Sequence, residues 1–549
     1  MSENWQIARA AGLVGFFTLL SRIAGLVRDA VVGYYFGTGP AADAFFVAFR
    51  VPNLLRRWVA EGAMGVAFIP VFTDYLTNRS RAEAFEAAAA LLTVMAAGLA
   101  VLTAAGVLLA PLLTQLFAPG FTDDPMKFAL TVTLTRLIFP YVFLISLVAL
   151  AAGILNALRH FTAPAMSPIL LNLSVIAAAV FLCPRLDVPA EGLAYGVVVG
   201  GILQLGLQLV GLLRLRVRIV PRWQPRHDAV RRTFALMAPM VFGAGVYQIN
   251  IMINTVLASL LPSGSVSFLW YADRVFQFPL GIFAVALGTA ALPSFAAQAA
   301  RGAYDELRRS LVFSMRLTNF IVLPATAGIV TLATPITAVL FQRGAFGFDQ
   351  AAATAQALAA FAAGLWSVSM VRLVVPAFYA MEDTRTPVIA AVTALVANCG
   401  FSLLLMGPVA GTGSHFARAL AALSQHAALL DLRHAGLALA TSLSATVNLI
   451  LLLVALRRRV GTLGAAELVP SFARSLAASI AMIPAVVYVS RLALWSQPGA
   501  LMAHAAVLGL AIGVGVTVFA VVAFLLGAEE VQAMMRILRH RLGPRLAIG

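Results

Sequence analysis

The stretch from Ser21 to Phe72 reads SRIAGLVRDAVVGYYFGTGPAADAFFVAFRVPNLLRRWVAEGAMGVAFIPVF and decides the fold class of this chain. It predicts two long apolar helices joined by a Gly-Thr-Gly-Pro turn. The charged residues inside these helices are Arg22, Arg28, Asp29, Asp43, Arg50, Arg56, Arg57 and Glu61. Each charge at the centre of a membrane helix costs roughly 2.5 to 3.5 kcal/mol, so it is tolerated where it faces water or another charge. The stretch therefore predicts the wall of a polar, mostly cationic chamber inside a membrane protein.

The composition of the whole chain agrees with a membrane protein. Of its 549 residues, 61% are hydrophobic and only 11% are charged, whereas a soluble domain has about 25% charged residues. The apolar runs are continuous rather than alternating, which favours helices over barrel strands. The net charge of +16 is dispersed between the runs, so we expect no nucleic-acid partner.

Enzymatic and metal-binding functions are not indicated by any motif. Cys183 and Cys399 have no metal-ligand spacing, and the histidines form no HExxH pair. The chain has neither a Walker motif nor a plausible hydrolytic triad. We expect a protein without enzymatic activity, metal or cofactor.

We predict an all-α polytopic membrane protein with fourteen transmembrane helices. The predicted spans are about 10–36, 42–76, 86–117, 127–156, 163–183, 190–213, 231–261, 267–297, 310–341, 351–380, 387–408, 432–456, 472–492 and 499–527. Most arginines outside the spans fall in loops on the same side as the N-terminus. By the positive-inside rule, both termini are expected to be cytoplasmic. The first apolar run continues past Arg22 and Arg28, so it does not resemble a cleavable signal.

Four sequence matches in register indicate an internal repeat. APLLTQLFAPG from Ala110 matches TPITAVLFQRG from Thr334, at an offset of 224 residues. The segments 68–72 and 291–295 match at an offset of 223, as do Pro164 and Pro387. GLAYGVVVGGILQ from Gly192 matches GLALATSLSATVN from Gly436, where an insertion near 410–433 enlarges the offset to 244.

The repeat predicts two six-helix lobes related as parallel repeats, followed by two further helices. We divide the chain into an N-terminal lobe with a basic cytoplasmic linker (1–230), a C-terminal lobe (231–460), and a segment with the last two spans and a basic cytoplasmic tail (461–549). In this arrangement the substrate binds between the lobes, and rocking of the lobes gives alternating access.

The second half of the chain repeats the intramembrane charges of the first. WYADRVFQFPLG places Asp273 and Arg274 on the eighth span, the counterpart of the second. Guanidinium groups bind phosphate oxygens through forked hydrogen bonds, and several of them on converging helices suit a diphosphate. Arg22 and Arg28 lie six residues apart, so they do not share one stripe of a helix.

Structural roles compete with binding roles for several of these charges. Arg56 and Arg57 are structural if the second span is broken near Pro52, and Glu61 is placed to pair with Arg57 one turn away. Asp29 and Asp43 are candidates for tethering the arginines when no substrate is bound. Asp383, in MEDTRTP, either caps the following helix or binds a coupling cation; capping is the simpler interpretation.

Four motifs resemble the MurJ (MviN) family of bacterial lipid II flippases, which belongs to the multidrug/oligosaccharidyl-lipid/polysaccharide exporter superfamily. They are SRIAGLVRDAVVGYYFG, ADAFFVAFRVPNLLRRWVAEGA, SGSVSFLWYADRVFQFPLG and VALGTAALPS. The resemblance covers essentially the whole chain. It implies fourteen helices, two lobes and a cationic central cavity, with the last two helices forming a groove for a prenyl tail.

The resemblance also assigns roles to single residues. It implies that Arg22, Arg28, Asp29, Arg56 and Arg274 bind the substrate. It implies supporting roles for Asp43, Arg57, Glu61 and Asp273. Asp383 fits the position of a cation ligand in some relatives, but Tyr379 occupies the position where a second, polar ligand is expected.

The function implied is transfer of the undecaprenyl-diphosphate-linked peptidoglycan precursor, lipid II, from the cytoplasmic to the periplasmic leaflet of the bacterial inner membrane. The membrane potential or a monovalent cation supplies the energy. The expected partners are lipid II, membrane lipids and proteins of cell-wall synthesis or division. Two alternatives are a flippase for another prenyl-diphosphate oligosaccharide and a drug/cation antiporter of the same superfamily; a membrane scaffold that recruits synthases is a third.

Overall fold

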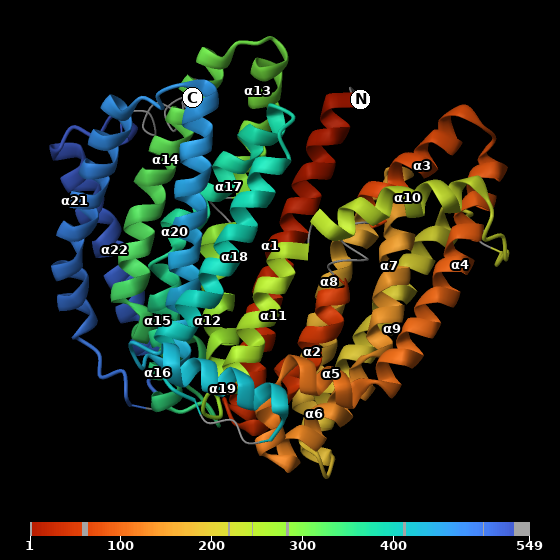
Figure 1. The fold of residues 1–549 in the computed structure, drawn as a ribbon, viewed down its shortest axis with the longest axis horizontal. Coiled ribbons are helices and arrows are strands. Elements are labelled where there is room, and N and C mark those ends of the chain that lie inside the picture. Colours follow the sequence, from red (N-terminus) through yellow and green to blue (C-terminus); the bar gives the residue numbers. More distant parts are fainter. Residues whose placement is uncertain are drawn as a thin grey trace, which may run out of the picture. The chain divides into compact units, whose positions relative to one another are not determined.

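The protein is described by a computed structural model that covers residues 3–56, 64–217, 220–243, 245–281, 285–409, 413–497 and 499–531. These residues form helices and no strand (Figure 1). The chain divides into two compact units. Unit 1 comprises Met1–Ser267 and Val409–Ala422, and unit 2 comprises Phe268–Pro408 and Leu423–Gly549. The three-part division predicted from the sequence concerns placement in the membrane, and it stays a prediction.

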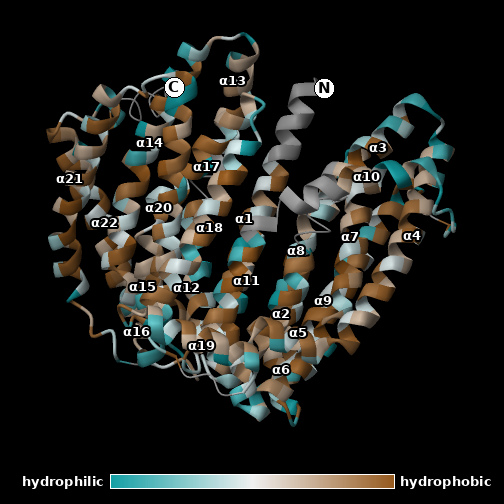
Figure 2. Cartoon of the chain, in the orientation of Figure 1, coloured by the Kyte–Doolittle hydropathy of each residue, from teal (hydrophilic) through white to brown (hydrophobic). Residues whose placement is uncertain are grey.

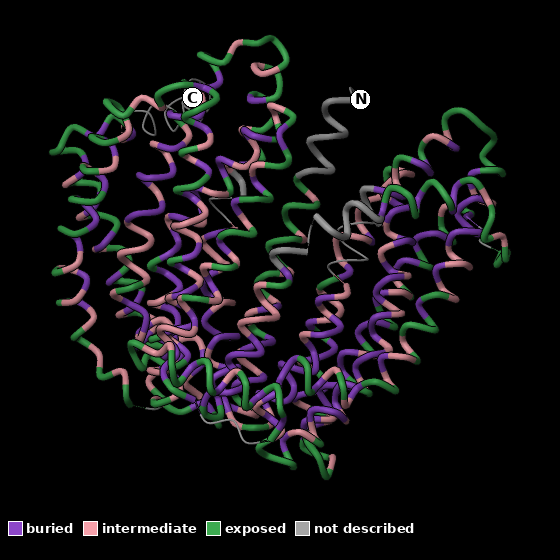
Figure 3. The backbone as a smooth tube through the Cα atoms, viewed as in Figure 1, coloured by how far each residue is buried: buried purple, intermediate pink, exposed green. Residues whose placement is uncertain are grey.

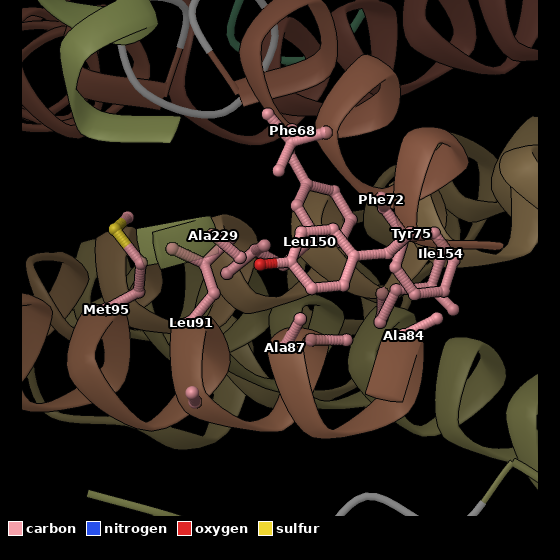
Figure 4. Packing of buried hydrophobic residues seen from close by; sticks show 14 of the residues in the cluster. Phe68, Phe72, Tyr75, Ala84, Ala87, Leu91, Met95, Leu150, Ile154 and Ala229 are labelled. Atoms are coloured by element: carbon pink, nitrogen blue, oxygen red, sulfur yellow. The ribbon is translucent and has the colours of Figure 1, made fainter. Parts of the chain in front are cut away.

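Unit 1 is built from long helices and short connecting turns. Its helices are α1 (Glu3–Phe36), α2 (Pro40–Leu55), α3 (Met64–Asn78), α4 (Arg81–Leu108), α5 (Ala110–Phe117), α6 (Pro125–Ile138), α7 (Pro140–Ala157), α8 (Thr162–Ala177), α9 (Pro189–Arg214), α10 (Asp228–Gly243) and α11 (Gly245–Ser259). α1 packs along α8, and α9 packs against both α7 and α8. A core of aromatic and aliphatic side chains, including Phe68, Phe72, Leu91, Leu150 and Ile154, joins α3, α4 and α7 (Figure 4).

Unit 2 has the same style of construction. Its helices are α13 (Val285–Ala300), α14 (Tyr304–Thr331), α15 (Ala333–Phe341), α16 (Phe348–Ala362), α17 (Leu365–Ala380), α18 (Arg385–Leu405), α20 (Arg433–Val460), α21 (Ala465–Ser490) and α22 (Leu501–Leu525). α12 (Ser265–Pro279) begins in unit 1 and continues in unit 2, and the boundary also falls within α19 (His415–Ala427). α19 lies in the predicted insertion near 410–433.

The described residues contain nine helices long and apolar enough to cross a membrane, or ten if α16 and α17, which are bent by 42°, form one span. Several predicted spans contain two helices each, and residues between the helices of the three pairs named next lie outside the described residues. The predicted span 42–76 contains α2 and α3, 231–261 contains α10 and α11, and 267–297 contains α12 and α13. Pro52 lies inside α2 near its end, and Pro279 is the last residue of α12. The count of fourteen stays a prediction.

Apolar residues dominate the lengths of helices such as α7 and α9, while hydrophilic residues gather in the turns (Figure 2). Along α21 and α22, buried and exposed residues alternate, and the exposed ones include Ile480, Tyr488, Val516 and Phe524 (Figure 3). Large apolar side chains exposed on this scale agree with a multi-pass membrane protein, whose outer surface faces lipid.

Local backbone geometry repeats at the offset found in the sequence. α7 ends in a turn in which His160 N–H donates to Leu155 C=O (2.8 Å), and α17 ends in a turn in which Asp383 N–H donates to Phe378 C=O (2.9 Å). The residue before each donor, Arg159 in the first turn and Glu382 in the second, has a positive φ, of 60° and 59° respectively. These are Schellman turns, and 159 and 382 differ by 223. The paired turns support the internal repeat.

A cluster of ionic interactions holds α21 and the end of α22 on α14. Arg316 on α14 donates to Glu530 (Nε–Oε1, 2.8 Å) and to Glu529 (Nη2–Oε2, 2.7 Å). Ser471 on α21 donates to the same oxygen of Glu530 at 2.9 Å, so the buried carboxylate of Glu530 has two donors from two helices. Three helices are therefore tied at one point.

Arg316→Met should lower the thermal stability of the detergent-solubilised protein, because it leaves the buried Glu530 without its cation. Hydrogen bonding to Arg316 lowers the pKa of Glu529 below the ordinary value of glutamate. The contribution of the ionised Glu529 to the free energy of unfolding is therefore present at pH values above that ordinary pKa, and it is lost as the pH falls through the lowered pKa. The difference between wild type and variant should narrow below about pH 4.5. Arg308→Met, which removes an exposed pair with Asp305, is the control; equal effects of the two changes would contradict this prediction.

Arg159→Gly should raise the free energy of unfolding by up to about 1 kcal/mol, because glycine adopts a positive φ without steric cost. Arg159→Val should lower it by about 1–2 kcal/mol, because a β-branched residue is strained there. The measurement is thermal unfolding in detergent. If Arg159→Gly and Arg159→Val were equally stable, or if neither differed from wild type, residue 159 would not be held in the left-handed conformation in the native state.

Candidate functional site

The charged residues of α1 sit on different faces of that helix. Arg28 and Asp29 are buried, and Arg22 is exposed. Six residues turn an α-helix by about 240°, so a helix that buries Arg28 leaves Arg22 on another side. The structure thus confirms that the two arginines do not form one stripe.

Arg28 is held by its neighbour in sequence. Its Nε and Nη2 atoms donate to Oδ1 of Asp29 at 3.0 and 2.7 Å, and its guanidinium carbon lies 5.8 Å from the ring centre of Phe49 on α2. The side chain of Arg28 is 9% exposed and that of Asp29 only 1%, so the charges compensate each other away from water. A guanidinium has five N–H donors, and the fork to Asp29 leaves others free to reach a ligand.

Asp43 lies in the first turn of α2, which Pro40 begins. Its Oδ2 accepts from Nζ of Lys127 (2.7 Å) and from the Gly264 N–H (2.8 Å). Its Oδ1 accepts from the N–H and hydroxyl of Ser267 at 3.0 and 2.6 Å. This carboxylate is 1% exposed and has four donors, so it joins the start of α2, the start of α6 and the first turn of α12 within unit 1. These contacts indicate a structural role, in which Asp43 holds the three segments together.

Lys127 was not among the predicted site residues. It is 7% exposed, donates to Asp43, and lies 4.0 Å from the ring centre of Phe121. The signal that could have found it is its type: it is the single lysine in a chain whose other basic residues are arginines. A lysine presents a compact point charge that fits a small buried cage.

The basic end of α2 is described in part. Arg56 follows the last residue of α2, and its Nε donates to Oδ1 of Asn53 at 2.9 Å. Arg50 donates to the hydroxyl of Thr255 on α11. Arg57 and Glu61 lie outside the described residues, so their predicted pairing stays a prediction.

In unit 2, α12 carries the other predicted pair. Asp273 and Arg274 are both half-buried. Asp273 accepts a hydrogen bond from Gln277 one turn later, and the guanidinium carbon of Arg274 lies 5.8 Å from the ring centre of Trp270. Tryptophan is the best aromatic partner for a cation, so this contact stabilises the charge of Arg274.

Asp383 precedes α18 and has the contacts of a helix cap. Its Oδ1 accepts from the N–H groups of Arg385 and Thr386, both at 3.0 Å, and Arg459 lies 2.8 Å from Oδ2. Burial raises the pKa of Asp383, but hydrogen bonds from Thr386 and the charge of Arg459 outweigh it, and the pKa lies below its ordinary value. These contacts support the capping interpretation. The described residues hold no group of three or more metal-ligating side chains.

The chemistry of these groups is that of anion binding. Arg22, Arg28, Arg56 and Arg274 present guanidinium groups, which match phosphate oxygens in geometry and charge. Asp29 accepts hydrogen bonds from two of the nitrogen atoms of Arg28, and Asp273 is adjacent in sequence to Arg274. Each acid is therefore placed to compete with an anionic ligand for the neighbouring cation.

Comparison with known proteins decides the family. The family model "Lipid II flippase MurJ" matches residues 32–431. The chain belongs to the MurJ family of lipid II flippases. A Burkholderia cenocepacia relative named lipid II flippase MurJ is 38% identical over 455 residues, which cover 82% of this chain and 84% of that protein. A Rhizobium tropici relative named probable lipid II flippase MurJ is 34% identical over 537 residues, 96% of each protein.

Solved structures show the same fold. A structure titled "Lipid II flippase MurJ, inward closed conformation" superposes with a TM-score of 0.75 at 23% identity, covering 93% of this chain and 98% of the other. An inward-facing MATE family multidrug transporter of the MOP superfamily gives 0.64 at 14% identity, covering 81% and 95%. The predicted resemblance to the MurJ family is confirmed, and the fold is shared with a MATE transporter of the MOP superfamily. The MurJ family consists of transporters, so the expectation of a non-enzyme is confirmed as well. The roles of the individual residues stay predictions.

Lys127→Met should destabilise unit 1 by about 3–5 kcal/mol, because it removes the cation paired with a buried carboxylate. The double variant Lys127→Met with Asp43→Asn should recover part of this loss, because no charge is then left buried. Thermal unfolding in detergent measures both. Arg226→Met, which changes an exposed cation, is the control and should shift stability by less than about 0.5 kcal/mol. A Lys127→Met protein as stable as wild type would show that the pair is not an anchor.

Proposed function

We propose that this protein flips lipid II, the undecaprenyl-diphosphate-linked peptidoglycan precursor, from the cytoplasmic to the periplasmic leaflet. The observation that carries the proposal is membership of the MurJ family, through a family match over residues 32–431 and relatives whose names state this activity. The arginines on α1, α2 and α12 supply the chemistry that a diphosphate headgroup requires.

The proposed topology has fourteen spans, two six-helix lobes as parallel repeats, and both termini in the cytoplasm of the bacterial inner membrane. Two observations support it. The loops rich in arginine alternate with loops that have few, and the Schellman turns after α7 and α17 recur at the sequence offset of the repeat. Alternating access then consists of rocking of the lobes about a site between them.

In the proposed mechanism the diphosphate binds arginine donors that the acidic partners leave unused. Arg28 is held by Asp29 in the buried pair, so the loss of water is already compensated before the substrate arrives. The diphosphate oxygens take the remaining donors of Arg28 and bind Arg22, Arg56 and Arg274. Arg57, Glu61 and Asp273 support these residues, and Asp43 fixes the start of α2.

The prenyl tail remains in lipid while the headgroup crosses. α21 and α22 are the proposed groove for it. They pack together, and the exposed apolar side chains on them, including Ile480 and Val516, offer hydrocarbon a largely apolar surface. The cluster at Arg316 fixes this pair of helices on α14.

The membrane potential is the proposed energy source. The interior of a cell is negative, so an anionic headgroup moving outward runs downhill by roughly 2.3 kcal/mol per charge per 100 mV. A cation site at Asp383 is the less favoured route to coupling, because the contacts of this carboxylate are already those of a cap and an ion pair. Partner proteins of cell-wall synthesis or division remain a prediction.

The decisive experiment replaces arginines in cells depleted of the native protein and measures the lipid II that a membrane-impermeant reagent can reach at the outer leaflet. Arg28→Ala and Arg274→Ala should each lower outward transport about 10- to 100-fold, because a hydrogen bond to a charged group contributes roughly 1.5–3 kcal/mol. Arg28→Lys should fall in between, because it keeps the charge but loses the fork. Arg226→Ala should behave as wild type.

Each outcome has a consequence for the proposal. If both alanine variants, expressed at the wild-type level, transported lipid II fully, the proposal that these arginines form the binding site would be wrong. Normal lipid II export after verified depletion, with no other flippase present, would favour another prenyl-diphosphate oligosaccharide as the substrate. The likeness to MATE transporters is one of fold, so it does not favour a drug/cation antiporter.

A further inference from the structure

A cavity of about 420 Å³ lies between α13 and α14, and its lining contains none of the residues assigned to lipid II above. Its polar lining consists of the guanidinium of Arg309 and the hydroxyls of Ser294, Ser310 and Ser314. Its apolar lining includes Phe295, which is buried, and Phe313, which is 57% exposed. Such a cavity combines a cation, hydroxyl donors and an aromatic surface open to the surroundings.

Arg309 differs from the other arginines of this hairpin. Arg301 pairs with Glu306 at 3.3 Å and Arg308 pairs with Asp305 at 3.2 Å. Arg309 makes no ion pair or hydrogen bond within the described part of the chain, although it is adjacent in sequence to a paired arginine. Its charge is therefore available to a ligand that brings an acidic group.

The serine hydroxyls are not equivalent. Nε2 of Gln298 donates to the hydroxyl of Ser310 at 2.8 Å, so that oxygen already accepts a hydrogen bond and its own proton is free to point into the cavity. The hydroxyl of Ser314 instead donates to the Ser310 carbonyl at 2.8 Å, and its proton is used. Arg309 and Ser310, on adjacent positions of α14, thus offer the lining a guanidinium and a hydroxyl proton as hydrogen-bond donors.

The length of α14 places this pair near the membrane surface. α14 has 28 residues, which span about 42 Å at 1.5 Å per residue, compared with about 30 Å for the hydrocarbon layer. Its first turns therefore extend into the headgroup region, where the exposed Tyr304 is a typical interfacial residue. Phe313 lies one turn further along α14 than Arg309, and its exposed ring is accessible to an acyl chain.

We propose that the cavity between α13 and α14 binds the phosphate of an anionic glycerophospholipid, with Arg309 and Ser310 on the headgroup and Phe313 against an acyl chain. The chemistry fits a phosphate ester carried by an apolar chain better than a soluble anion, because the lining combines a cation and hydroxyls with the exposed aromatic ring of Phe313. The segment 532–549 is not a complementary occupant, because it contains arginines and no acidic residue.

The test measures lipid binding to the purified full-length protein, not transport, so it is independent of the proposed flippase activity. Native mass spectrometry follows titration with phosphatidylglycerol. Arg309→Ala should raise the half-saturating concentration about 10-fold, and Arg308→Ala should change it less than about 2-fold. Ser310→Ala should weaken binding about 3-fold, whereas Ser314→Ala should leave it unchanged. Phe313→Ala should weaken phosphatidylglycerol binding too.

Three results would overturn the proposal. Equal effects of Arg309→Ala and Arg308→Ala would show that the cavity holds no specific anion. Displacement of phosphatidylglycerol by millimolar inorganic phosphate would show a soluble-anion site instead. At least 10-fold tighter binding of undecaprenyl phosphate, lost in Arg309→Ala, would show a site for the prenyl substrate and not for glycerophospholipid. If Arg309→Ala does not fold, Arg309→Gln serves the same comparison.

Discussion

A charge that is taken out of water must find its partner inside the protein, and the placement of helices in unit 1 depends on that constraint at Asp43. The carboxylate is nearly inaccessible, and four donors from Lys127, Gly264 and Ser267 surround it. Moving any of the three segments away would expose an uncompensated charge to an apolar environment. One side chain thus fixes the start of α2 relative to α6 and to the first turn of α12.

The same constraint explains why the other intramembrane charges occur in pairs or against aromatic rings. Arg28 lies on Asp29, and Arg274 lies by Trp270. Such partners keep a cation in place without removing its capacity to bind an anion, since a guanidinium has more donors than one carboxylate oxygen can use. A protein that must bind a diphosphate and release it again benefits from cations that are compensated in both states.

The internal repeat was predicted from weak sequence matches, and it appears in the backbone also at positions where the side chains differ. Arg159 and Glu382 share no side-chain chemistry, yet both adopt a left-handed conformation at the end of a helix. Backbone geometry at a helix end is dictated by the hydrogen bonds of the turn, so it persists when the side chain changes. The breaks after α4 and α14, at Leu109 and Leu332, differ by the same 223 residues.

The sequence by itself determined the class of protein, the family, and which residues carry unusual charge, because composition, hydrophobic run length and motif spacing are local properties. It also predicted that Arg22 and Arg28 point in different directions, since helix geometry alone decides this. Only the tertiary structure decided the partners. The pairing of Asp43 with Lys127, 84 residues later, and of Arg316 with Glu529 and Glu530 depends on which helices pack together. The interruptions at Leu109, between α4 and α5, and at Leu332, between α14 and α15, were likewise missed, because an apolar run has the same hydropathy whether its helix is continuous or interrupted.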